Sequence, residues 1–190
     1  MRLRLLLPSA LVVLVTGQAA AQAGKVSTAQ VITLAAVKPG QLTLAVTAGA
    51  VQSLPTLTDN AVNVFPTPVT IQTEWDVNPG KTGTVNVVGW FSSPAQALVN
   101  GSTGTPIPSS MMKGRMLTGA VPAFTAFTQN GVGGVGSAGG SLRLLNLTIT
   151  GTNKKVTRTD NLDLEIDLTG AAVLPIGTYS GTLNLEAITQ

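Results

Sequence analysis

Hydrophobic and polar residues alternate with a period of two along several stretches of the chain. In PVTIQTEWDV (68–77) the residues that share one face are Val69, Ile71, Thr73, Trp75 and Val77. In NLDLEIDLTG (161–170) aliphatic residues alternate with Asp163, Glu165 and Asp167. Successive side chains of a β-strand point to opposite faces, so each stretch predicts a strand with one buried and one solvated face.

The same reasoning predicts further strands over 41–47, 84–92, 142–150 and 179–189, and shorter ones over 31–37, 62–64 and 124–127. Lys38-Pro39-Gly40 and Asn78-Pro79-Gly80 place proline and glycine as a type II turn requires. Helical periodicity is absent after the first residues. Many short strands separated by turns predict an all-β sandwich or barrel.

Two of these strands break the simple alternation. In SLRLLNLTIT (141–150) the apolar phase changes after Leu144, which predicts a β-bulge there or burial on both faces. In TVNVVGWF (84–91) Val88 and Trp90 lie on the face opposite to Val85, Val87 and Phe91. Either this strand is central and covered on both sides, or Trp90 is an exposed contact for a ligand or partner.

The first residues have the pattern of a secretory signal peptide. Arg2 and Arg4 precede an apolar run from Leu5 to Val15, and Ala21-Gln22-Ala23 fits the cleavage site. We therefore divide the chain into a signal peptide (1–23) and a single β-sandwich domain (24–190), secreted or periplasmic. The mature chain would keep nine Lys and Arg against eight acids. Such a balance gives no electrostatic reason to expect nucleic acid or membrane insertion.

The composition limits the chemistry that this chain can perform. It contains no His and no Cys, which excludes a Ser-His-Asp or Cys-His site, thiolate metal sites and disulfides. Glu74 and Asp76 are a candidate carboxylate pair, which we interpret as solubilising an outer face. We predict no enzyme activity, no cofactor and no metal site.

Two motifs suggest ligand binding but have simpler interpretations. Asp163, Glu165 and Asp167 spread along a straight strand, so we expect solvation or cross-strand pairing with Arg143, Lys154, Lys155 or Arg158 rather than calcium binding. GVGGVG (131–136) matches a dinucleotide fingerprint, but no βαβ pattern surrounds it, so we interpret it as a flexible loop.

The stretch LPIGTYSGTL (174–183) resembles the closing hairpin of bacterial exported β-sandwich domains of the spore coat U and pilin-like type. Proline and glycine make its turn, Tyr179 starts the strand, and Leu183 and Leu185 continue its inward face. The resemblance implies an immunoglobulin-like Greek-key β-sandwich without enzyme activity, and assembly at the cell surface through copies of itself or other surface proteins.

The sequence thus predicts a non-catalytic structural or assembly protein of the bacterial surface: a coat, fimbria or filament subunit or an accessory to one. The alternative is a module that binds a carbohydrate or surface polymer through Trp90. The apolar segment Lys25–Val37 also has two possible roles. It either forms the first strand of its own domain, which a short Pro-Gly corner favours, or inserts into the next subunit.

Overall fold

A computed structural model describes residues 40–77 and 83–190, all within one compact unit that begins at Val37. Within these residues the fold is all-β, and the single helical turn is the 3₁₀ turn η1 (Ser109–Met111). The predicted signal peptide, the predicted strand over 31–37 and most of the two predicted Pro-Gly turns lie outside the described residues.

The described strands range in length from two to thirteen residues. In chain order they are β1 (Gln41–Ala48), β2 (Val62–Val64), β3 (Val69–Asp76), β4 (Gly83–Trp90), β5 (Leu98–Asn100), β6 (Pro106–Ile107), β7 (Met112–Arg115), β8 (Thr125–Ala126), β9 (Ser141–Ile149), β10 (Lys155–Asp167), β11 (Tyr179–Ser180) and β12 (Asn184–Thr189).

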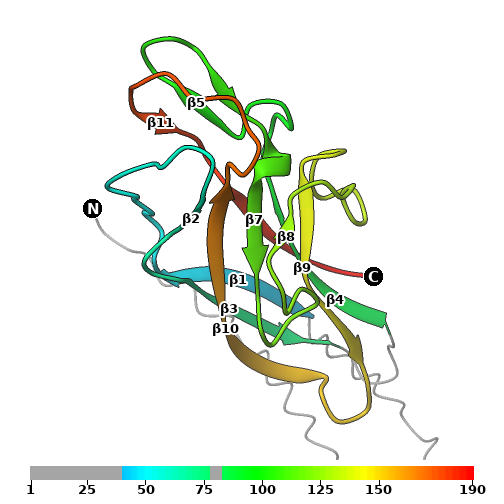
Figure 1. Cartoon of the computed structure of the whole chain (residues 1–190). Helices are drawn as coiled ribbons and strands as arrows, with labels where there is room; N and C mark the ends of the chain where they lie inside the picture. Colours follow the sequence, from blue (N-terminus) through cyan, green and yellow to red (C-terminus); the bar gives the residue numbers. More distant parts are fainter. Residues whose placement is uncertain (1–39, 78–82) are drawn as a thin grey trace, which may run out of the picture. The chain divides into compact units, whose positions relative to one another are not determined.

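All strand pairs are antiparallel, and they form three sheets (Figure 1). The largest has the order β1-β3-β10-β7-β8, with β2 also pairing β10. The second is β12-β4-β9 and the third is β11-β5-β6. The long strand β10 connects two regions of the largest sheet, because residues 155–162 pair with β3 and residues 163–167 pair with β7 and β2.

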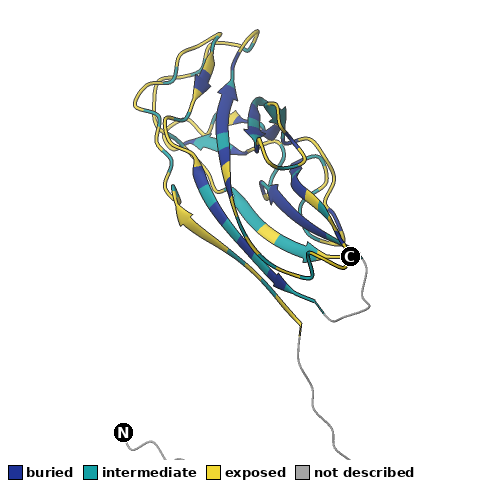
Figure 2. Ribbon diagram, turned by 90° about the horizontal axis from the view of Figure 1, so that it is seen from below, coloured by how far each residue is buried: buried dark blue, intermediate teal, exposed yellow. Residues whose placement is uncertain are grey.

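The two larger sheets share one hydrophobic core. Ile71 and Leu162 come from the sheet of β3 and β10, whereas Val87 and Leu145 come from the sheet of β4 and β9, and all four belong to one buried cluster. A smaller cluster surrounds Trp75, which is fully buried against Val85 and Ile149. Figure 2 shows the alternation of buried and more exposed positions along these strands.

The structure confirms the predicted buried faces of β3 and β10 and explains both irregular strands. The prediction of a solvated outer face on β10 was wrong for Glu165, which is buried. Val87 pairs with Leu145 and Val88 with Arg143, which leaves Leu144 as the extra residue of a bulge. Strand β4 lies between β12 and β9, and its residues 85–89 are buried on both faces. The predicted strand over 179–189 is interrupted, because Tyr179 and Ser180 pair with β5 while Asn184–Thr189 pairs with β4.

Candidate functional site

The described residues form a groove that is lined mostly by apolar side chains. It has a volume of about 690 Å³ and lies between two segments that are distant in sequence. One wall is residues 46–57, which covers the end of β1 and the segment after it, and the other is residues 177–185, which leads into β12. Side chains from the main core, including Val69, Met112 and Leu164, also line it. The groove therefore opens directly onto the hydrophobic core.

Both strands beside the groove have an unpaired edge within the described residues. Among residues 40–77 and 83–190, β1 pairs only with β3, and β12 pairs only with β4. The apolar side chain of Val46 at the end of β1 is 38% exposed. An unpaired edge next to exposed apolar surface is the arrangement to which another strand adds readily.

The wall of residues 177–183 contains the motif that carried the resemblance to exported sandwich domains. Tyr179 pairs with Asn100 of β5, and its hydroxyl donates a hydrogen bond to the Pro175 carbonyl at 3.0 Å. Asn100 is buried and accepts hydrogen bonds from the backbone N–H groups of Ser102 and Thr103. Gly177 has φ +151°, and a Cβ there would come within 2.6 Å of the Asn100 amide nitrogen. The wall is thus fixed by its own turn and by β5.

The opposite wall contains a polar group that the sequence did not single out. Gly49 has φ +71°, and a Cβ at this residue would lie 2.3 Å from the Pro68 carbonyl oxygen. The side-chain Nε2 of Gln52 donates a 2.8 Å hydrogen bond to the Gly49 carbonyl. Its Oε1 is buried and has no hydrogen-bond partner within the described residues. Gln52 lies in a stretch without periodicity, so no pattern could have identified it.

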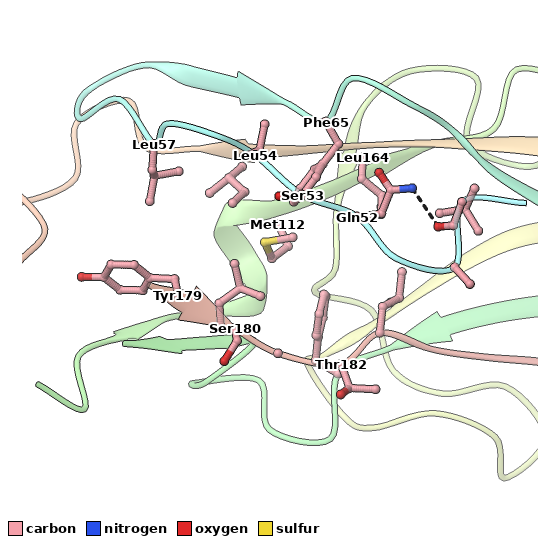
Figure 3. Close-up of a pocket in the computed structure, with 18 of the residues that line it drawn as sticks. Gln52, Ser53, Leu54, Leu57, Phe65, Met112, Leu164, Tyr179, Ser180 and Thr182 are labelled. Carbon is pink, nitrogen blue, oxygen red and sulfur yellow. Dashed lines mark hydrogen bonds between the residues drawn. The ribbon is translucent and has the colours of Figure 1, made fainter. Parts of the chain in front are cut away.

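Figure 3 shows how these side chains lie around the groove. Tyr179, Ser180 and Thr182 follow one wall, and Gln52, Ser53, Leu54 and Leu57 follow the other. Met112 lies between them. Apolar side chains dominate the lining, which suits a hydrophobic occupant better than a charged one.

The acidic row on β10 is paired, but with residues that the sequence did not predict. Asp163 accepts hydrogen bonds from Arg115 at 2.9 and 3.1 Å, and Asp167 accepts one from Lys113 at 2.6 Å. Glu165 lies 3.7 Å from the same Lys113 nitrogen. The expected partners Arg143, Lys154, Lys155 and Arg158 were wrong because β7, whose pattern predicted no strand, pairs beside this half of β10.

These ion pairs shift the protonation equilibria in opposite directions. The hydrogen bond from Lys113, followed by those from Thr169, holds the pKa of Asp167 well below its usual range. The hydrogen bond to Asp167 raises the pKa of Lys113. Each partner therefore favours the charged form of the other. This charged ladder accounts for the acidic row without a metal ion, and the described residues hold no cluster of three metal-ligating side chains.

A further ion pair lies on the inward face of β10. Arg158 donates hydrogen bonds to Asp160 at 2.6 and 2.7 Å and another to the Thr118 carbonyl. The Thr118 hydroxyl donates to Asp160 at 2.5 Å, and Asp160 is 5% exposed. Arg158 and Asp160 lie on the same face of β10 as Leu162, because every second residue of a strand points to the same side. The network links β10 to the segment that follows β7.

The other candidate residues lie outside the groove. Trp90 is half-buried at the end of β4, where it pairs with Asn184 of β12 and Ser141 of β9. Phe91 lines the groove, and Trp90 points to the opposite face of the sheet. Glu74 and Asp76 lie on the outer face of β3, and Asp76 is 3.7 Å from the Lys155 nitrogen. In the glycine-rich loop, Val132 and Val135 form a small bridged turn next to Ile188 and Gln190.

No protein-family model matches the chain, and no curated protein or solved structure matches it either. Among residues 40–77 and 83–190 there is no helix with the length and hydropathy needed to span a bilayer.

Proposed function

We propose that this protein is a secreted or periplasmic, non-catalytic structural or assembly protein of the bacterial cell surface. In this proposal it joins its neighbours by accepting an extended segment into the apolar groove. The observation that carries the proposal is a groove that opens onto the core beside β1 and β12, each of which has one edge unpaired in the part of the chain that the structure describes.

The fold assignment belongs to the same proposal. Two antiparallel sheets that share one core, and a chain that crosses repeatedly between them, support an immunoglobulin-like Greek-key β-sandwich. In such a domain a groove beside strand edges that are unpaired within the described residues is a place where a further extended segment can add. The signal-peptide pattern of the first residues supports export, and the resemblance of residues 174–183 supports surface assembly.

The oligomeric state of the mature protein tests this proposal. We expect filaments or heat-resistant multimers by light scattering and negative-stain microscopy. Leu54→Glu places a charge on the groove wall and should abolish them, because the charge would have to be buried beside the inserted segment. Leu117→Glu is the matched control, since Leu117 is 66% exposed and does not line the groove. Both variants should first be shown to melt cooperatively.

A carbohydrate- or polymer-binding module is the second candidate function. Trp90 lies on the same face as Val88, whose ladder partner is Arg143. Arg143 also lines a shallow hollow of about 440 Å³ with the polar side chains of Gln129, Asn130 and Asn146. Trp90 does not itself line this hollow, so a sugar platform here would combine the half-buried ring with polar side chains of the same sheet. A protein that stays monomeric, binds on a glycan array and loses that binding in Trp90→Ala would replace the assembly proposal with this one.

A further inference from the structure

Asparagine followed by glycine occurs twice in this chain, at Asn100-Gly101 and at Asn130-Gly131. Such a pair is chemically reactive, because glycine has no Cβ to shield its backbone nitrogen from the neighbouring carboxamide. Asn100 ends β5, whereas Asn130 immediately precedes the glycine-rich loop. We propose that Asn130, and not Asn100, is a site of spontaneous deamidation in the folded protein, and that the reaction neutralises the positive hollow lined by Arg143.

The reaction needs only water. The backbone nitrogen of Gly131 loses its proton to solvent base and attacks the side-chain carbonyl carbon of Asn130. Ammonia leaves as the new C–N bond closes a cyclic succinimide. Water then opens either carbonyl of the ring, which gives aspartate, or isoaspartate with the main chain running through the former side chain. No oxidant, metal or second protein takes part, so the site does not depend on either of the functions proposed above.

Both reacting groups of the Asn130-Gly131 pair are accessible. Asn130 and Gly131 are exposed to solvent. No described residue accepts a hydrogen bond from the Gly131 N–H, and the Asn130 carboxamide makes none with a described residue. Neither the nucleophile nor its target therefore has to leave a partner before the ring closes.

The other pair is held on both of its reacting groups. Asn100 is 1% exposed, and its Oδ1 accepts hydrogen bonds from two backbone N–H groups of the turn that follows it. The Gly101 N–H, which would be the nucleophile, donates a 3.1 Å hydrogen bond to the Thr178 carbonyl. Ring closure here requires a local opening that breaks all of these bonds. We therefore expect Asn100 to react on the order of 100-fold more slowly than Asn130.

Exposure alone does not make an asparagine reactive. Asn146 is exposed and lines the same hollow as Asn130, but it lies within β9 and is followed by Leu147. The leucine side chain shields the backbone nitrogen, and the pairing of β9 with β4 restrains the backbone rotation that ring closure requires. We expect Asn146 to stay intact, which makes it an internal reference for Asn130.

Deamidation of Asn130 changes the charge of the hollow. Arg143 is half-buried, and among the described residues that line the hollow it is the one charged side chain. None of the ion pairs of the described residues includes Arg143. A carboxylate at position 130 brings a negative charge into the same hollow, so its charge changes from positive to neutral. The modified hollow then no longer attracts anions.

The isoaspartate product also lengthens the main chain between two fixed points. On one side Gln129 pairs with Ser141, and on the other Val132 and Val135 are bridged by hydrogen bonds of 2.8 and 3.0 Å. An added main-chain methylene requires one of these bridges to shift. We expect the Val132–Val135 bridge to open, so that its two amide protons exchange with solvent on the order of 10-fold faster in the isoaspartate form.

Peptide mapping by mass spectrometry tests the site. The folded protein is incubated at mildly alkaline pH beside protein unfolded in guanidinium chloride, and both are digested under acidic conditions, in which further deamidation is slow. In the folded sample we expect acidic forms of the Asn130 peptide, whereas the Asn100 peptide stays intact. In the unfolded sample both pairs should react at similar rates. Equal rates at the two sites of the folded protein, or an Asn130 that reacts only when unfolded, would overturn the proposal.

Two substitutions test the change of charge. Asn130→Ser should abolish the acidic form that accumulates on anion-exchange chromatography, and Asn130→Asp should elute with the aspartate product. Asn146→Ser is the matched control, because it removes the other exposed asparagine of the hollow and should leave the acidic form unchanged. An acidic form that persists in Asn130→Ser would overturn the proposal. Unchanged amide exchange at Val132 and Val135 in the purified isoaspartate form would reject the expected opening of their bridge.

Discussion

Replacement of Trp75 tests the assignment of inward and outward faces most directly. The indole is fully buried between Val85 and Ile149, and its Nε1 donates a 2.8 Å hydrogen bond to the Asn153 carbonyl. Removing a buried tryptophan to alanine costs about 3 to 5 kcal/mol through lost burial and the cavity that remains. The orphaned Asn153 carbonyl adds about 1 kcal/mol if water cannot reach it. We therefore expect Trp75→Ala to lower stability by about 4 kcal/mol.

Thermal and denaturant unfolding measure this loss. For a domain of this size about 4 kcal/mol corresponds to a fall in Tm of roughly 8 to 16 °C. Glu74→Ala is the control, because Glu74 neighbours Trp75 on the opposite face and is only half-buried. It should change stability by less than about 0.5 kcal/mol. Equal Tm values for the two variants would show that the faces of β3 are assigned the wrong way round.

Three further predictions concern the ion pairs and the start of the mature chain. Asp160→Ala should lower the free energy of unfolding in urea by about 3 to 5 kcal/mol, because it leaves the Arg158 guanidinium without its carboxylate beside the core. Thr118→Val removes one hydrogen bond and should cost only about 1 kcal/mol. The folded-state pKa of Asp167 lies below its unfolded value, so this group contributes stability above about pH 4 that is lost as pH falls further. Asp167→Asn should therefore flatten the acid side of a plot of Tm against pH. An unchanged slope would contradict this. Intact-mass measurement should place the first residue of the exported protein at Gly24, with cleavage after Ala21 as the second choice, and a mass that includes residues 1–20 would contradict export.

The sequence by itself determined the strands in which one face is buried. In β3 and in the second half of β10, alternation with period two fixed which side chains are inward, because a shift by one residue would expose every apolar group. The bulge at Leu144 was also readable, since an extra residue necessarily changes the phase of the apolar positions. Local geometry alone produces these signals.

Tertiary structure decided what depends on neighbours in space. Strand β7 has too few residues for a periodic signal, yet its pairing with β10 supplies the partners of the acidic row. Arg158 and Asp160 point inward because they alternate with outward residues along β10. Their burial depends on Thr118, which comes from another segment and completes the hydrogen bonds of both side chains. The groove joins segments more than a hundred residues apart, so no local pattern could have predicted it. Strand patterns are local, whereas a groove arises from the packing of distant segments.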